Sequence, residues 1–225
     1  NLVIHPGETV AIMGSTGCGK TALVSLIPRF YDTSEGTVLV DDVDVRRYVQ
    51  NDLREKIAVT LQKSELFSAS IQENISWGSP GASDEAIHAS AEVAQADDFI
   101  RRTSRGYDTL VAEQGTSLSG GQKQRISIAR AVLKPASILI FDDSTSALDL
   151  KTEANLYSAL SESRPESTKI LVAQRIASVR RADRIVVLSQ GSIEACGTHD
   201  ELLRSCKTYQ DIYHSQIGNE GENYE

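Results

Sequence analysis

The segment Gly14 to Thr21 constrains this chain more than any other part of its sequence, because it fits the pattern G-x-x-x-x-G-K-[ST]. It follows the apolar run Val10 to Met13, a candidate buried strand, and it opens a helix that we predict over Lys20 to Phe30. Glycines in such a loop let backbone N–H groups turn toward a phosphate, Lys20 reaches the β- and γ-phosphates, and the Thr21 hydroxyl ligates Mg²⁺. The predicted phosphate-binding residues are Gly14, Ser15, Thr16, Gly17, Cys18, Gly19, Lys20 and Thr21.

Apolar runs alternate with helical patterns along the chain, which is typical of an α/β fold with a mostly parallel sheet. The stretch from about 71 to 134 is rich in helix and poor in strand, so we predict a helical subdomain inserted into the α/β core. One domain would span residues 1–217, and the polar residues 218–225 would form a disordered tail. Further strands are predicted at 37–40, 57–61, 138–141, 169–173 and 185–188, and further helices at 84–94, 96–102, 119–133 and 152–160.

Charge and cysteine content exclude some classes of protein. The net charge of −8 argues against nucleic acid as a partner, since phosphate backbones attract basic surfaces. The short basic stretch Arg175 to Arg184 is interpreted as a solvated face of the fold. The three cysteines follow no disulfide or metal pattern, which indicates a reducing compartment. Within the phosphate loop, Cys18 is interpreted as a space-filling residue in preference to a redox-active thiol.

A second glycine-rich motif, Leu118 to Gln122, stands at the start of a predicted helix. Its residues Ser119, Gly120, Gly121 and Gln122 place small groups at a helix N-terminus, which is a second anion-binding arrangement. One phosphate group does not require two such motifs in one chain. We therefore expect the second one to serve a nucleotide held by a partner molecule.

With both motifs in place, the sequence resembles the nucleotide-binding domains of ABC transporters across essentially its whole length. Gln62 matches the family's Q-loop glutamine, and Ser146 to Asp149 matches its D-loop. Phe67 to Ile75 and Glu113 resemble the exporter branch, in which Glu113 would contact transmembrane helices. The resemblance implies a P-loop NTPase (RecA-like) core, and a head-to-tail dimer in which two ATP molecules lie between the phosphate loop of one domain and the signature Leu118 to Gln122 of the other.

The resemblance also implies features that the chain does not display. Family members carry an N-terminal antiparallel β-subdomain and an aromatic residue that stacks on adenine upstream of the phosphate loop. Gly14 stands close to the start of this chain, and no aromatic residue precedes it. We therefore expect that this β-subdomain is truncated and that a transmembrane domain was connected on that side.

Two positions depart from the family pattern, and both concern hydrolysis. Asp142 matches the aspartate associated with Mg²⁺, but the next position, normally glutamate, is Asp143. Aspartate is shorter by about 1.5 Å, and an error of about 1 Å in placing a general base can cost on the order of 100-fold in rate. The switch histidine is replaced by Gln174, which can donate a hydrogen bond but carries no charge and shuttles no proton. The histidines of the chain stand elsewhere, at His5, His88, His199 and His214.

These observations lead to the hypothesis of one half of an asymmetric, heterodimeric ABC exporter at the cytoplasmic face of a membrane. Its own site would bind Mg-ATP with little turnover, with Asp143, Gln174 and Gln62 in the catalytic positions and Thr21, Gln62 and Asp142 around the metal. Its signature would complete the partner's site. The alternatives are an active homodimeric ATPase, a nucleotide-sensing module without a transport role, and a soluble ABC ATPase of translation or repair.

Overall fold

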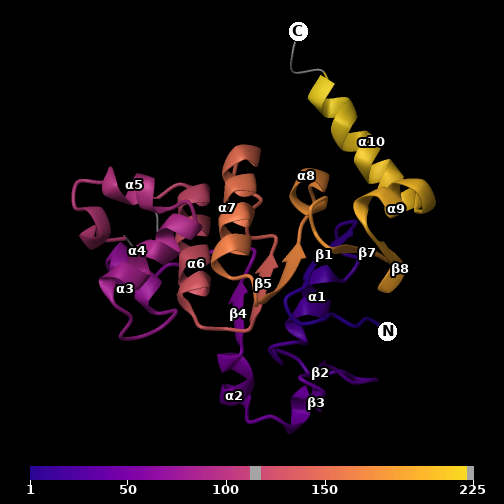
Figure 1. Ribbon diagram of the computed structural model, residues 1–225, viewed down its shortest axis with the longest axis horizontal. Coiled ribbons are helices and arrows are strands. Elements are labelled where there is room, and N and C mark those ends of the chain that lie inside the picture. Colours follow the sequence, from indigo (N-terminus) through magenta and orange to yellow (C-terminus); the bar gives the residue numbers. More distant parts are fainter. Residues whose placement is uncertain (112–117, 222–225) are drawn as a thin grey trace. The chain divides into compact units, whose positions relative to one another are not determined.

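The computed structural model describes residues 1–111 and 118–221 and divides into two compact units. Unit 1 combines residues 1–54 with the chain from Thr168 onward, and unit 2 covers residues 55–167. Each unit contains both strands and helices, as Figure 1 shows along the chain. The mixed α/β class predicted from the sequence is thus confirmed.

Unit 1 is built on a sheet in which β6, β1, β7 and β8 follow one another in that order. Strand β1 (Thr9–Gly14) pairs in parallel with β6 (Thr168–Val172) and with β7 (Arg184–Ser189), whereas β8 (Ser192–Gly197) runs antiparallel to β7. The inner strands are nearly continuous apolar runs and are buried, as expected for a parallel sheet covered on both faces. The strands predicted at 10–13, 169–173 and 185–188 are confirmed.

The other elements of unit 1 are short, apart from the last helix. Figure 1 shows α8, α9 and α10 grouped together, and α10 contacts both of the others. Helix α9 is absent from the elements predicted from the sequence, although Thr198 and Glu201 form a capping box at its start. These elements are α1 (Lys20–Ser25), β2 (Leu39–Val40), β3 (Val43–Asp44), η1 (Val45–Arg47), α2 (Gln50–Glu55), α8 (Ile176–Val179), α9 (His199–Ser205) and α10 (Lys207–Gly221).

The helix predicted over Lys20 to Phe30 is shorter in the structure, where α1 ends at Ser25. Beyond that residue the backbone continues as tight turns, in which the amides of Leu26 and Ile27 bond to carbonyls three residues earlier. Pro28 explains the early end, because proline lacks an N–H and disfavours helical backbone at the residue before it. The strand predicted at 37–40 is likewise reduced to β2.

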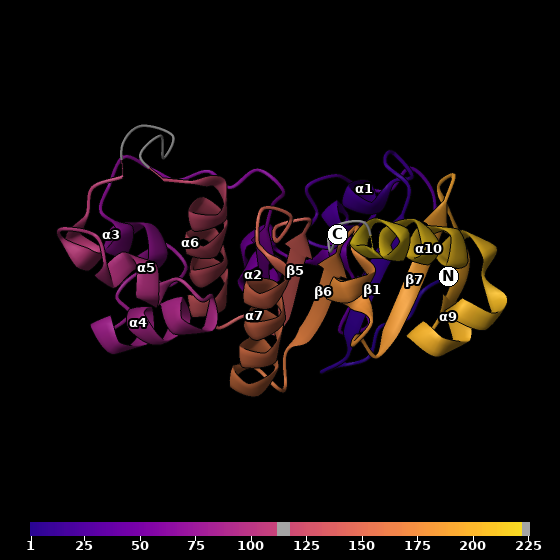
Figure 2. The same ribbon diagram turned by 90° about the horizontal axis from the view of Figure 1, so that it is seen from above.

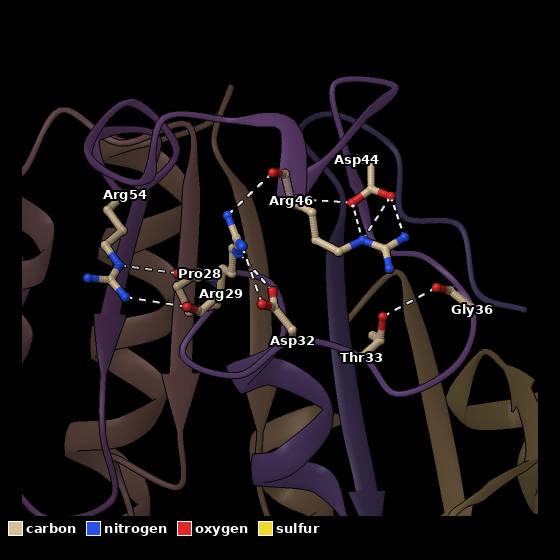
Figure 3. A network of polar contacts seen from close by, with 8 residues as sticks. All are labelled: Pro28, Arg29, Asp32, Thr33, Gly36, Asp44, Arg46 and Arg54. Carbon is tan, nitrogen blue, oxygen red and sulfur yellow. Dashed lines mark hydrogen bonds and ion pairs between the residues drawn. The ribbon is translucent and has the colours of Figure 1, made fainter.

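Polar contacts hold the irregular segment between α1 and α2. Figure 3 shows Arg29, whose Nε lies 2.7 Å from Oδ1 of Asp32. The guanidinium group of Arg54 donates to the carbonyl oxygens of Pro28 and Arg29 at 3.3 and 3.4 Å. These bonds give partners to backbone carbonyls that no helix or strand uses.

Unit 2 joins two parallel strands, β4 (Ile57–Thr60) and β5 (Ile138–Asp142), to a group of helices. Figure 2 shows α3, α4 and α5 on one side of α6, with β5 and α7 on its other side. Both α3 and α4 pack on α6. The strands predicted at 57–61 and 138–141 and the four helices predicted in this range are confirmed within a few residues. The helical elements are α3 (Ile71–Ser76), α4 (Asp84–Val93), α5 (Asp97–Arg101), η2 (Gly106–Asp108), α6 (Gly120–Leu133) and α7 (Leu150–Ser163).

The domain bounds remain a proposal, with one local difference at the end of the chain. We retain 71–134 as the proposed helical subdomain, since α3 to α6 fall inside that range. Helix α10 continues to Gly221, so residues 218–221, predicted as part of a disordered tail, are helical. Over the described residues, every helix is too short or too polar to cross a bilayer.

Candidate functional site

The predicted phosphate loop follows β1 directly, and glycines shape it. Gly14, Gly17 and Gly19 have φ angles of 148°, 81° and 101°, which residues with a Cβ rarely adopt. A Cβ on Gly14 would in addition overlap the carbonyl oxygen of Leu188 in β7. At Gly17 and Gly19, leaving aside the adjoining residues, no atom of the described chain lies within 4 Å of the Cβ position. The loop is therefore closed at its start and accessible to a ligand further along.

Lys20 turns its ammonium group back onto this loop. Its Nζ donates to the carbonyl oxygens of Gly14 at 2.7 Å and Ser15 at 2.9 Å, and it lies 3.7 Å from Sγ of Cys18. Cys18 is buried, which fits its interpretation as a residue that fills space inside the loop. The loop thus holds its positive charge close to its own backbone.

The first turn of α1 completes this group of donors. Gly19 is the N-cap residue and has no side chain with which to accept a hydrogen bond from the first N–H groups. Thr21 is exposed in this turn, and Ser15 and Thr16 are exposed in the loop. Backbone N–H groups, one ammonium group and several hydroxyls together suit the oxygens of a phosphate.

Two buried carboxylates stand at the end of β5 in unit 2. Asp142 is the last residue of the strand and is 2% exposed, and Asp143 follows with 8% exposed and a φ of 47°. The amide Nε2 of Gln62 donates to Oδ2 of Asp143 at 3.1 Å. The structure therefore brings together two of the three residues predicted for catalysis, although the sequence places them far apart.

The second glycine-rich motif begins α6, as predicted. Ser119 is the N-cap residue, and its Oγ accepts the amide of Gln122 at 3.3 Å. Oε1 of Gln122 in turn accepts the amide of Ser119 at 2.9 Å, which completes a capping box. Gly121 lies close to the backbone of Ala147, where a Cβ would stand 3.0 Å from the carbonyl oxygen. The motif is thus stabilised by its own side chains and packs against the D-loop.

Gln124, which is not among the residues predicted for the site, fixes the D-loop to α6. Its Nε2 donates to Oγ of Ser146 at 3.3 Å, and its Oε1 accepts the amide of Ala147 at 3.0 Å. Asp149 then caps α7 by accepting hydrogen bonds from Thr152, which hold the pKa of its carboxyl below the ordinary value. No local sequence pattern indicates the role of Gln124, because its partners follow more than 20 residues later.

Gln174 comes directly after β6 and the buried Ala173, in unit 1, and is exposed. Because β6 is the parallel neighbour of β1, the carboxyl ends of both strands lie at the same edge of the sheet of unit 1. The amide of Ala173 donates to the carbonyl of Ile12 at 3.3 Å. Gln174 therefore follows a strand whose end is fixed beside the strand that leads into the phosphate loop.

The predicted site residues are divided between the two units. Unit 1 contains the phosphate loop and Gln174, and unit 2 contains Gln62, Asp142, Asp143 and the signature. The predicted metal ligands are divided in the same way. Glu113, predicted to contact transmembrane helices, lies outside the described residues.

Comparison with known proteins identifies the class to which this fold and these motifs belong. The family model for ABC transporters matches residues 1–146. The chain therefore belongs to the ABC transporter family, and its fold is that of the family's P-loop nucleotide-binding domain.

Two relatives illustrate the extent of the similarity. The ATP-dependent lipid A-core flippase of Chromohalobacter salexigens is 44% identical over 217 residues, which cover 96% of this chain and 38% of that protein. A solved structure of a bacterial Atm1-family ABC exporter with ATP bound is 40% identical with a TM-score of 0.92, and the match covers 95% of this chain and 38% of that one. The chain thus spans well under half the length of these relatives.

Proposed function

We propose that this chain is the Mg-ATP-binding motor domain of an ABC exporter, that its own site turns ATP over slowly, and that its signature serves a partner domain. The observation that carries the proposal is a contrast between motifs. The phosphate loop keeps every residue of its pattern, with Lys20 held at the loop backbone. The family uses two further positions for hydrolysis. Asp143 has a shorter side chain than the glutamate of the family pattern, and Gln174 is uncharged where the pattern has a histidine.

The residues of the chain fit the nucleotide and the metal that the family uses. The accessible backbone at Gly17 and Gly19 suits a phosphate group. Mg²⁺ takes oxygen ligands, and Thr21, Gln62 and Asp142 offer a hydroxyl, an amide and a carboxylate oxygen for it. When bound, Mg²⁺ neutralises phosphate charge. Lys20 would bind the β- and γ-phosphates, because its ammonium group already lies at the loop.

Asp143 is proposed as a weak general base. Its side chain is shorter than glutamate by about 1.5 Å, so its oxygens fall short of a water placed for glutamate. Strand β5 and the left-handed backbone at Asp143 fix where the side chain starts, and Oδ2 accepts a hydrogen bond from Gln62. These restraints support slow turnover, since the backbone has little freedom to compensate for the missing carbon.

Gln174 is proposed to contact the γ-phosphate as a hydrogen-bond donor. A glutamine amide donates without a change of charge, so it senses the phosphate but shuttles no proton. Together with Asp143 it would yield a site that holds ATP for long periods.

The signature is proposed to act on a partner's nucleotide. The packing of Gly121 against Ala147 and the capping box of Ser119 hold this motif ready on a long helix. A second nucleotide-binding domain in head-to-tail arrangement would present its ATP here, and the hydrolysis-competent site would be that of the partner. A transmembrane domain joined to this chain would place it at the cytoplasmic face of a membrane.

The test is to measure Mg-ATP affinity and turnover of the native chain in the same samples. We expect saturable binding and a turnover below about 0.1 per second, about a hundredfold under a typical enzyme. Turnover near 10 per second would favour the fully active homodimer. Absence of Mg-ATP binding would overturn the proposal at the phosphate loop.

A further inference from the structure

One side chain holds two backbone groups of the segment that follows β6. Nε2 of Gln216, on α10, donates to the carbonyl oxygen of Gln174 at 2.7 Å. Oε1 of Gln216 accepts the amide of Ile176 at 2.8 Å. The amide group of Gln216 therefore spans Arg175 and restrains the backbone on both sides of it.

The second of these bonds caps a helix that cannot cap itself. Arg175 occupies the N-cap position of α8, and a guanidinium group has no acceptor atom for the first N–H groups of a helix. The oxygen of Gln216 supplies that acceptor from another helix. Ile176 and Val179 anchor α8 in the core of unit 1, where α10 contacts it.

The bond from Gln216 to the carbonyl oxygen of Gln174 restrains the residue that contacts the γ-phosphate in the proposed function. Gln174 is exposed, and its backbone sets the point from which its side chain starts and therefore the positions that its amide group can reach. Ala173 is fixed to Ile12 at the edge where the phosphate loop begins, and Gln216 holds the carbonyl of Gln174 itself. The backbone on both sides of Gln174 is thus held by hydrogen bonds, and one of these bonds comes from α10.

We infer that Gln216 is a positioning residue, which aims Gln174 at the terminal phosphate and so lets the C-terminal helix set the preference for ATP over ADP. This inference rests on the proposed function, because it uses the contact between Gln174 and the γ-phosphate. ADP lacks that phosphate, so ADP affinity should not depend on Gln216. A change in the ratio of the ADP and ATP dissociation constants in a Gln216 variant therefore reports an effect at the terminal phosphate.

The experiment compares Gln216→Ala and Gln216→Glu with the matched control Gln210→Ala in the full chain. Gln210 lies on the same helix and makes the same kind of bond, from Nε2 to the carbonyl of Leu203 at 2.7 Å, and not to the segment that follows β6. Glutamate at 216 keeps an acceptor for the amide of Ile176 and loses the donor for Gln174. Dissociation constants for Mg-ATP and Mg-ADP, melting temperature and hydrogen exchange of the Ile176 amide are measured for each variant.

We expect Gln216→Ala to weaken Mg-ATP binding by about fivefold, as for loss of one hydrogen bond, while Mg-ADP binding changes less than about twofold. Exchange of the Ile176 amide should accelerate in Gln216→Ala and remain slow in Gln216→Glu, which should nevertheless lose ATP preference. Gln210→Ala should lower the melting temperature to a similar extent and leave the ratio unchanged.

An unchanged ratio in Gln216→Ala, or an equal change in Gln210→Ala, would overturn the inference. Failure of the proposed slow turnover would appear in a different measurement. A native chain that binds ATP and hydrolyses it quickly would contradict slow turnover. The ratio of dissociation constants, measured with a non-hydrolysable ATP analogue, would still decide the role of Gln216.

Discussion

Two helices of this chain begin at glycine-rich motifs, and their first turns are built differently. Helix α1 follows Gly19, which has left-handed backbone and no side chain to cap the helix. Helix α6 follows Ser119, whose hydroxyl forms a capping box with Gln122. The first turn of α1 therefore has no side-chain cap from its N-cap residue, whereas the first turn of α6 is capped by Ser119.

The difference separates the roles of the two motifs in the proposed function. The phosphate loop gains stability from a bound phosphate, so it should be the site at which the chain alone binds ATP. The signature is stable without a ligand, and it adds contacts when a partner brings a nucleotide to it. We therefore propose that the first motif binds ATP in the chain alone and that the second motif recognises a nucleotide brought by a partner.

Adding a methyl group to the leading glycine of each motif should give the largest contrast. In Gly14→Ala the new Cβ would overlap the carbonyl oxygen of Leu188, and alanine would have to adopt the positive φ of Gly14. We therefore expect a loss of about 3 kcal/mol in the free energy of unfolding. In Gly120→Ala the new Cβ would lie 3.7 Å from that of Ala147, an ordinary contact, and the change should stay within about 1 kcal/mol. Urea unfolding of both variants measures this, and equal losses would contradict the account of the loop.

Removal of the loop's ammonium group should come next in size. Lys20→Ala should weaken Mg-ATP binding by the chain alone on the order of 100-fold, because charge-assisted bonds to phosphate are lost. The control is Lys151→Ala, which removes an exposed lysine from α7. Titration calorimetry on both variants gives the affinities. Similar affinities in the two would show that ATP binds elsewhere.

Loss of the signature cap should affect stability and leave binding unchanged. Ser119→Ala removes the acceptor for the amide of Gln122 and should cost about 1 kcal/mol in the free energy of unfolding. Mg-ATP affinity of the chain alone should stay the same, and Ser119→Thr should retain most of the stability. A clear loss of ATP affinity in Ser119→Ala would mean that the signature binds nucleotide without a partner.

Removal of the ion pair beside the strand that leads to the phosphate loop should have a smaller effect, which should depend on pH. Arg184 forms a two-point ion pair with Glu8, with Nη2 2.8 Å from Oε2, and it lowers the pKa of Glu8 below 4.5. A lowered folded-state pKa gives stability that is present above pH 4.5 and is lost as pH falls through that pKa.

The control is Ser119→Ala, because Ser119 caps α6 with a neutral hydroxyl group. Glu8→Gln should lower the melting temperature at neutral pH and reduce its fall between pH 6 and pH 3, whereas Ser119→Ala should lower it equally at both pH values. If the melting temperature falls equally with pH in Glu8→Gln and in the native chain, the ion pair of Glu8 and Arg184 does not cause the loss of stability in acid.

Much of the fold follows from local patterns in the sequence. The apolar runs that form β1, β5 and β7 are short and rich in β-branched residues, which favours buried strands, and Ser119 marks the start of α6. The early end of α1 could have been predicted from Pro28. Helix α10 could not, because its apolar face is weak and it is held by particular contacts such as that of Gln216 with Gln174.

The candidate site likewise has one part that the sequence predicts and another part that it does not. The phosphate loop is predictable because its glycines, lysine and threonine are neighbours in the chain. The contact of Gln62 with Asp143 joins residues on different elements, so only the fold brings them together. The partners of Gln124 and Gln216 are polar side chains without a motif, which periodicity and spacing do not detect.

The central claim is that the chain binds ATP and hydrolyses it slowly because of Asp143 and Gln174. The most direct test compares Mg-ATP turnover of the native chain with that of the variant Asp143→Glu/Gln174→His, with ATP binding followed in the same samples. We predict equal binding and a rise in turnover of about tenfold or more in the variant. Fast and equal turnover in both would contradict the claim and identify Asp143 as an adequate base.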